Sequence, residues 1–109
     1  MTGIVIEITG EPTFTAPVSL SRPGKEPAVV DFTFKHKTRD ELVAWGERAR
    51  APGASTADLL SEIVADWGAQ IAQPYSPEAL RILLQNYHTA DVDIAKGYRK
   101  ALAEAREKN

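Results

Sequence analysis

The sequence contains no cysteine and few of the residue patterns on which catalysis and metal binding depend. Without cysteine the chain has no disulfide framework, no thiolate metal site and no Cys nucleophile. His36 and His88 lie far apart, and neither has a carboxylate or a second histidine at metal-ligand spacing. No Gly-rich phosphate loop and no Gly-x-Ser-x-Gly motif is present. We therefore expect no catalytic residue, no metal site, no cofactor and no enzymatic activity.

Long apolar runs and a strong excess of either charge are also missing. The apolar runs are far shorter than the ~18 residues of a membrane span, so no membrane association is expected. No basic segment precedes an apolar stretch at the N-terminus, as it would in a signal peptide. A net charge of -2 argues against a dedicated nucleic-acid binder. With 109 residues, we expect one cytoplasmic domain over 1–109.

The first third of the chain has the alternation of apolar and polar residues that predicts β-strands. Three stretches show it, at 4–8, at 13–20 and in a segment that ends near Lys37. Turn residues separate them, at Gly10-Glu11-Pro12 and at Arg22-Pro23-Gly24-Lys25. Pro17 cannot donate to a ladder, so it places the second strand at a sheet edge or at a bulge. We predict a small antiparallel sheet of about three N-terminal strands.

The remainder of the chain predicts four helices. Thr38 stands three residues before Glu41, which is the spacing of a capping box, and this first helix ends near Arg50. The other helices are expected from Ser55 or Thr56 to Gly68, from Ser76 with Pro77 at the first helical position, and from about Thr89 to the end. The expected buried face of the last helix is Val92, Ala95, Tyr98, Leu102 and Ala105. We predict an α+β fold with a β-rich part at 1–37 and a helical part at 38–109, the helices packed on the sheet.

The strand-to-helix junction also carries a family resemblance. Residues 32–39 read Phe-Thr-Phe-Lys-His-Lys-Thr-Arg, and an acidic helix start follows. This stretch resembles the signature of the tail assembly chaperones of long-tailed bacteriophages. Residues 58–67 and 74–87 are similar to the second and third helices of that family. The resemblance covers residues 28–109, and the first 27 residues carry no family-specific signal.

The resemblance implies a function without an active site. Members of this family bind the long, aggregation-prone tape measure protein and then recruit tail tube subunits, which displace the chaperone. By that resemblance, the chain is expected to bind and solubilise the tape measure protein and to help recruit the tail tube protein. It would also self-associate, act in the host bacterial cytoplasm and be absent from the mature virion.

Candidate partner-binding residues come from the uneven distribution of charge and from one tryptophan. Residues 51–80 contain acidic residues and no Lys or Arg, whereas residues 96–109 are mainly basic. These are either two solvated faces or complementary surfaces of neighbouring copies. Trp45 lies beside Gly46 and packs either within the core or against a partner. The candidate set is Trp45, Asp58, Glu62, Asp66, Lys96, Arg99, Lys100 and Arg106.

Two other functions and one feature of the gene stay open. The chain could be a structural virion protein of the tail, such as a connector or terminator. It could also be a small regulator that grips nucleic acid through the basic last helix, and such binding would weaken steeply with salt. Glu107-Lys108-Asn109 can be encoded as GAA AAA AAC, a slip-prone string that would support a programmed frameshift. The codons GAG AAG AAC at this place would contradict that hypothesis.

Overall fold

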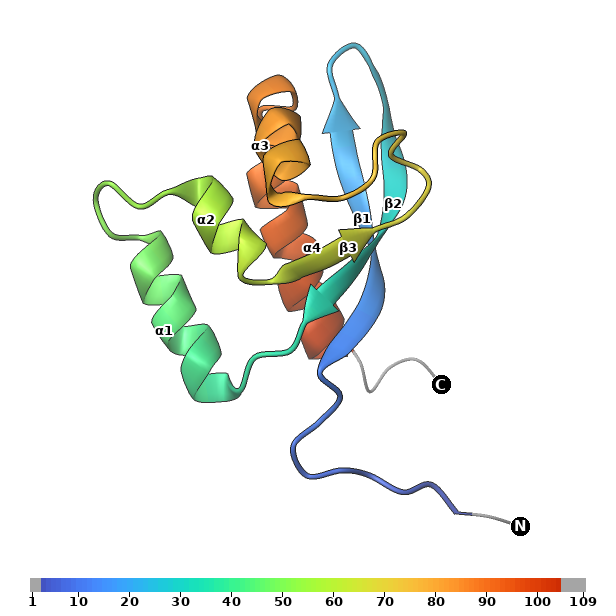
Figure 1. Cartoon of the computed structure of the whole chain (residues 1–109), viewed down its shortest axis with the longest axis vertical. Coiled ribbons are helices and arrows are strands. Elements are labelled where there is room, and N and C mark those ends of the chain that lie inside the picture. The colour runs from blue at the N-terminus through green and yellow to red at the C-terminus, as the bar shows by residue number, and fades with distance from the viewer. Residues whose placement is uncertain (1–2, 105–109) are drawn as a thin grey trace.

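The computed structural model describes residues 3–104, which form a three-stranded antiparallel sheet and four helices (Figure 1). This arrangement confirms the predicted α+β class. The elements in chain order are β1 (Thr13–Arg22), β2 (Lys25–Lys35), α1 (Arg39–Ala49), α2 (Thr56–Ser61), β3 (Val64–Trp67), α3 (Pro77–Asn86) and α4 (Ala90–Glu104).

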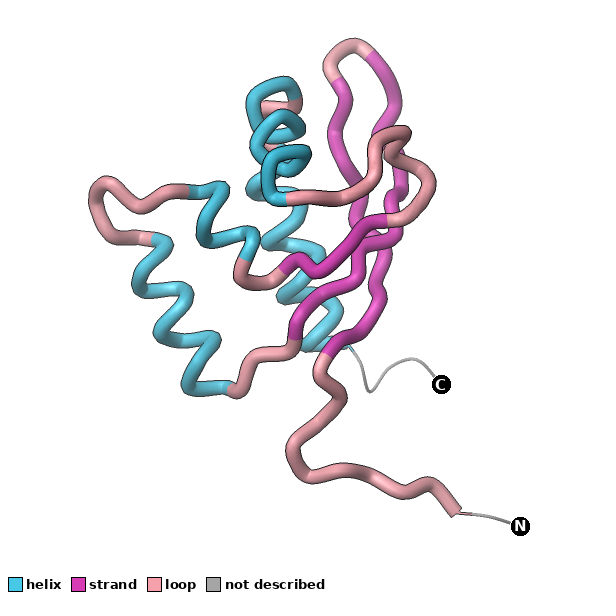
Figure 2. Tube along the Cα trace, in the orientation of Figure 1, coloured by secondary structure: helices cyan, strands magenta, loops and turns pink. Residues whose placement is uncertain are grey.

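β1 and β2 form a long hairpin, and β1 is an edge strand of the sheet (Figure 2). The chain reverses at the predicted turn, where Gly24 has a φ of 70° that a residue with a side chain rarely adopts. Pro17 lies opposite Asp31, and the prediction that Pro17 marks an edge strand is confirmed. Along both strands every second side chain is buried beneath the helices, and the others form an exposed outer face.

The third strand is not the predicted one. β3 pairs antiparallel with the second edge of β2, with Phe32 opposite Trp67, and it lies in the part of the chain that was predicted to be helical. The prediction of a helix that continues to Gly68 is therefore wrong, because α2 ends at Ser61. The β-branched Val64 and the aromatic Trp67 favour extended backbone. Pairing with β3 also gives hydrogen-bond partners to backbone groups on the edge of β2 that faces away from β1. These groups would lack such partners if α2 continued as a helix.

The predicted strand at 4–8 is absent from the structure. Residues 3–8 run along no strand of the sheet, and Ile4, Val5, Ile6 and Ile8 are almost fully exposed. The alternation of apolar residues is present, but within residues 3–104 nothing pairs with it. In Figure 1 this segment leaves the sheet at the start of β1 and extends away from the domain.

α4 packs along β1 on the inner face of the sheet, α2 contacts β3, α3 packs on α2 and α4, and α1 lies farther out against α2 (Figure 1). Local signals set the starts of the helices. The capping box at the start of α1 is confirmed, since the Glu41 amide donates to Thr38 Oγ1 (3.2 Å) and the Thr38 amide donates to Glu41 Oε1 (2.9 Å). Ser76 caps α3, with Pro77 at its first position, as predicted. The predicted face of α4 is partly wrong, because Val92 is 62% exposed. The residues that α4 buries lie four apart, at Ala90, Ile94 and Tyr98.

Candidate functional site

Trp45 packs within the chain. Its side chain is 3% exposed, and its Nε1 donates a hydrogen bond of 2.9 Å to the carbonyl oxygen of Leu59. The ring of Tyr98 meets it edge-on, at 6.3 Å between centroids, and the guanidinium of Arg99 lies 5.6 Å from its centroid. Trp45 therefore joins α1 to α2 and α4, which is the internal placement that the sequence left open.

The acidic candidates do not share a helix face, because the chain turns from α2 into β3 between them. Asp58 accepts from Arg81 of α3 (3.2 Å). Glu62 accepts from both terminal nitrogens of Arg48, at 2.7 and 2.9 Å, and this bidentate pair holds the pKa of the Glu62 carboxyl below its ordinary value. Asp66 lies in β3, where its carboxylate accepts from the amide of Trp67. Two of these three carboxylates are thus engaged in ion pairs within the chain.

The basic candidates stay together on one side of α4. Lys96, Arg99 and Lys100 are exposed, and their spacing of three and four residues places them along one stripe of the helix. Arg106 and the Glu107–Asn109 codon site lie outside the described residues. The structure therefore brings together Lys96, Arg99 and Lys100, and it places Arg99 against Trp45.

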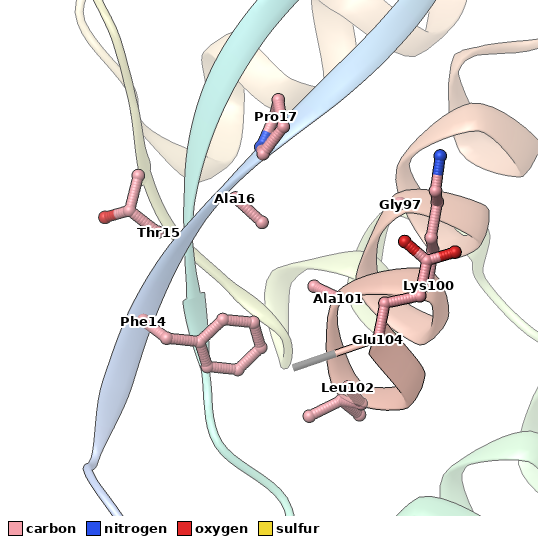
Figure 3. Close-up of a pocket in the computed structure, with 9 residues that line it drawn as sticks. All are labelled: Phe14, Thr15, Ala16, Pro17, Gly97, Lys100, Ala101, Leu102 and Glu104. Atoms are coloured by element: carbon pink, nitrogen blue, oxygen red, sulfur yellow. The ribbon is translucent and has the colours of Figure 1, made fainter. Parts of the chain in front are cut away.

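A groove between β1 and α4 escaped the sequence analysis. We call it the β1–α4 groove; it encloses about 490 Å³ (Figure 3). Its lining is Phe14, Thr15, Ala16, Pro17, Gly97, Lys100, Ala101, Leu102 and Glu104. In Figure 3 the ring of Phe14 reaches from β1 towards α4, and Lys100 and Glu104 stand on the helix side. The groove thus has apolar walls and one charge of each sign on its helix side.

The shape of the groove follows from small residues in α4. A Cβ atom at Gly97 would lie 2.7 Å from Val18 Cγ2, so α4 approaches β1 at this point more closely than any residue with a side chain would allow. Beyond Gly97, Ala101 occupies the position one turn later and leaves the space between the two elements open. A glycine in the interior of a predicted helix was the signal in the sequence that could have located this crossing.

A second, smaller apolar depression lies over α3, and we call it the α3 hollow. It measures about 150 Å³ and is lined by Trp67, Ile71, Gln73, Ala79, Ile82, Leu83, Asn86 and Tyr87. Its wall is fixed by Trp67, whose Nε1 donates to the carbonyl oxygen of Gln73 (2.8 Å) and whose ring meets Tyr75 edge-on. Ile82 is 55% exposed at its border. The hollow is therefore a preformed apolar surface beside an exposed aliphatic side chain.

Within residues 3–104, no group of three His, Asp or Glu side chains is placed to hold a metal ion. None of the helices described there is long and apolar enough to cross a membrane. The features that remain are two apolar depressions, a basic stripe and an exposed apolar N-terminal segment.

Comparison with known proteins gives a family for the chain. No curated protein sequence and no solved structure matches the chain significantly. The family model described as phage tail assembly chaperone matches residues 1–109. The match therefore includes the first 27 residues, in which the sequence alone showed no family signal. Because the family model spans the full length, the chain belongs to the phage tail assembly chaperone family.

Proposed function

We propose that this chain binds the tape measure protein of its phage, keeps it soluble in the host bacterial cytoplasm and helps recruit tail tube subunits. The observation that carries the proposal is the family match over residues 1–109. A protein with this task works by reversible contact and needs no catalytic centre. It would leave the assembly when the tube forms, and it would be absent from the mature virion.

The α3 hollow supports this proposal as the place where a client segment binds. An amphipathic helix is recognised when its apolar side chains enter a preformed apolar depression. The hollow offers the rings of Trp67 and Tyr87 as walls, with Ile82 exposed at the border. Gln73 and Asn86 are the polar residues of its lining, and the Asn86 side-chain nitrogen donates to the Ile82 carbonyl oxygen (2.9 Å). Polar residues at the border of an apolar site can orient a ligand through hydrogen bonds.

The first test is co-expression of the tagged chain with the tape measure protein of the same phage. The wild-type chain should keep the large protein in the soluble fraction and co-purify with it. Ile82→Lys should lower the amount that co-purifies by about tenfold or more, because burial of one Ile side chain contributes roughly 1.5–3 kcal/mol and each 1.4 kcal/mol is a factor of ten in affinity.

Val92→Lys is the matched control for this test. Val92 is also an exposed aliphatic residue on a helix, at 62% against 55% for Ile82, and it does not line the hollow. Equal co-purification by the two variants would reject the α3 hollow as the client site. A tape measure protein that stays insoluble with the wild-type chain, together with this chain in purified virions, would favour a structural tail protein instead.

A further inference from the structure

Within residues 3–104, no strand pairs with the outer edge of β1, and the hydrogen bonds of Asp31 show which backbone groups of β1 face that edge. The carbonyl oxygen of Asp31 accepts from the Gly68 amide (2.8 Å), and the backbone amide of Asp31 donates to Gln70 Oε1 (3.4 Å). Both backbone groups of Asp31 therefore face away from β1. Pro17 is the partner of Asp31 in the register. Asp31 and Pro17 thus form a non-hydrogen-bonded pair, in which the backbone N–H and C=O groups of both residues point away from the partner strand. Residues two positions along the same strand point the same way. The backbone groups of Thr13, Thr15 and Pro17 therefore face the open edge.

This edge is closed at one end and open at the other. Near the end of β1, the Ser21 amide faces outward and donates to the Asp93 carboxylate of α4 (2.9 Å). Towards the start of β1, where the β1–α4 groove lies, no strand of the described chain covers the backbone of Thr13 and Thr15. The open edge and the apolar groove thus coincide. An added strand can form backbone hydrogen bonds with the open edge of β1 and place its side chains in the β1–α4 groove.

The N-terminal arm, residues 3–8, has the sequence that such a strand requires. Ile4, Ile6 and Ile8 would share one face of an extended strand, and Val5 and Glu7 would share the other. All four aliphatic side chains of the arm are at least 81% exposed in the single chain. A contiguous apolar segment of this kind marks an interaction site.

The arm is preceded in space by a segment that stays beside β2, and it extends from the domain beyond the start of β1 (Figure 1). The His36 amide donates to the Pro12 carbonyl oxygen (2.9 Å), which continues the pairing of β1 with the β2 side. A Cβ at Gly10 would lie 3.4 Å from the His36 ring, so the chain passes that ring closely. Between the arm and this point the chain makes a turn, in which the Gly10 amide donates to the Glu7 carbonyl oxygen. Beyond this turn the arm pairs with no strand of the described chain and its aliphatic side chains are exposed, so it is available to a second copy.

We propose that the N-terminal arm of one copy adds as a strand to the open edge of β1 in a second copy. Its backbone bonds to the outward groups of Thr13 and Thr15, and Ile4 and Ile6 enter the β1–α4 groove. Each copy would contribute its arm to one neighbour and its β1 edge to another. Because these are two different surfaces, the contact is head-to-tail and continues into a ring or a filament. This inference concerns self-assembly and does not depend on the client site.

Cross-linking between two single-cysteine chains tests the proposal, since the natural chain contains no cysteine. One variant carries Val5→Cys and the other, of different mass, carries Thr15→Cys. Both side chains are exposed and would lie on the outer face of the added strand pair, where opposite Cβ atoms are ~4.5–5.5 Å apart. With a short bismaleimide, the mixture should give a covalent heterodimer. Ile4→Lys with Ile6→Lys in the Val5→Cys chain should abolish it.

Asp66→Cys supplies the matched acceptor on the opposite edge strand, β3. A heterodimer through Asp66→Cys that equals the one through Thr15→Cys would overturn the assignment to β1. The double variant Val5→Cys/Thr15→Cys, at high dilution, reports pairing within one chain. A link confined to single chains, or no link at all, would equally reject exchange between copies. Circular dichroism of each variant, compared with the natural chain, establishes that the fold is intact.

Discussion

Two glycines inside helices, Gly46 of α1 and Gly97 of α4, should respond in opposite ways to replacement by alanine. Alanine is favoured over glycine in a helix interior by about 0.8–1.0 kcal/mol, and this contribution is the same at both sites. At Gly46 the new Cβ would lie 3.2 Å from Nη2 of Arg99, the end of a long side chain that can move aside. Gly46→Ala should therefore stabilise the fold by up to about 1 kcal/mol.

At Gly97 the new Cβ would lie 2.7 Å from Val18 Cγ2, in a buried side chain that is held within the sheet. Overpacking of this kind typically costs about 1–3 kcal/mol, which offsets or exceeds the gain in helix propensity. Gly97→Ala should thus range from neutral to about 2 kcal/mol destabilising. The difference between the two variants isolates the overpacking term, because the propensity term cancels.

Urea denaturation of both variants measures this difference, and thermal unfolding gives it as a Tm gap of about 4–8 °C per kcal/mol for a domain of this size. Val18→Ala should cost less in the Gly97→Ala background than in the natural chain, because it removes the atom that the new methyl group meets. If Gly97→Ala stabilises as much as Gly46→Ala, α4 does not approach β1 as closely as described and the explanation of the groove is wrong.

Two further substitutions test the contacts that join α1 to the rest of the domain. Trp45→Phe removes one of two donors to the Leu59 carbonyl oxygen, which keeps its bond from the Glu62 amide (3.2 Å). The loss of this one hydrogen bond should destabilise the fold by about 0.5–1.5 kcal/mol in urea denaturation, whereas an unchanged midpoint would show that water replaces the bond. Glu62→Gln should cost at most about 1 kcal/mol at pH 7, because its pair with Arg48 is partly exposed. Because Arg48 holds the pKa of Glu62 below its ordinary 4.5, this contribution is present above pH 4.5 and is lost as the pH falls through the lowered pKa. A deficit of the variant that does not shrink as the pH is lowered from 7 into the acid range would contradict the assignment.

The sequence predicted the elements whose ends are set by neighbouring residues. The Thr38–Glu41 capping box and the Ser76-Pro77 helix start depend on contacts within one turn, so they could be found without the fold. β3 could not, because the apolar positions from Leu59 to Trp67 also fit a helical stripe. Only the unpaired edge of β2, far away in the sequence, decides between the two structures.

The candidate sites show the same limit. The basic stripe of Lys96, Arg99 and Lys100 follows from helical spacing, and it is exposed on α4. The two apolar depressions arise where elements distant in the sequence meet, as β1 meets α4 at Gly97, and no local pattern gives that geometry. The alternation of apolar residues at 4–8 predicts a strand. Its residues have the strand pattern, but the described chain offers them no partner.

The positions of the two tryptophans give the molecule separate optical reporters. Trp67 forms a wall of the α3 hollow, so its emission should change when a ligand covers that surface. Trp45 is enclosed between α1, α2 and α4, away from the lining of either depression, and its emission should change only when these helices separate. With one tryptophan replaced at a time, fluorescence can therefore distinguish occupation of the hollow from unfolding of the domain without any attached label.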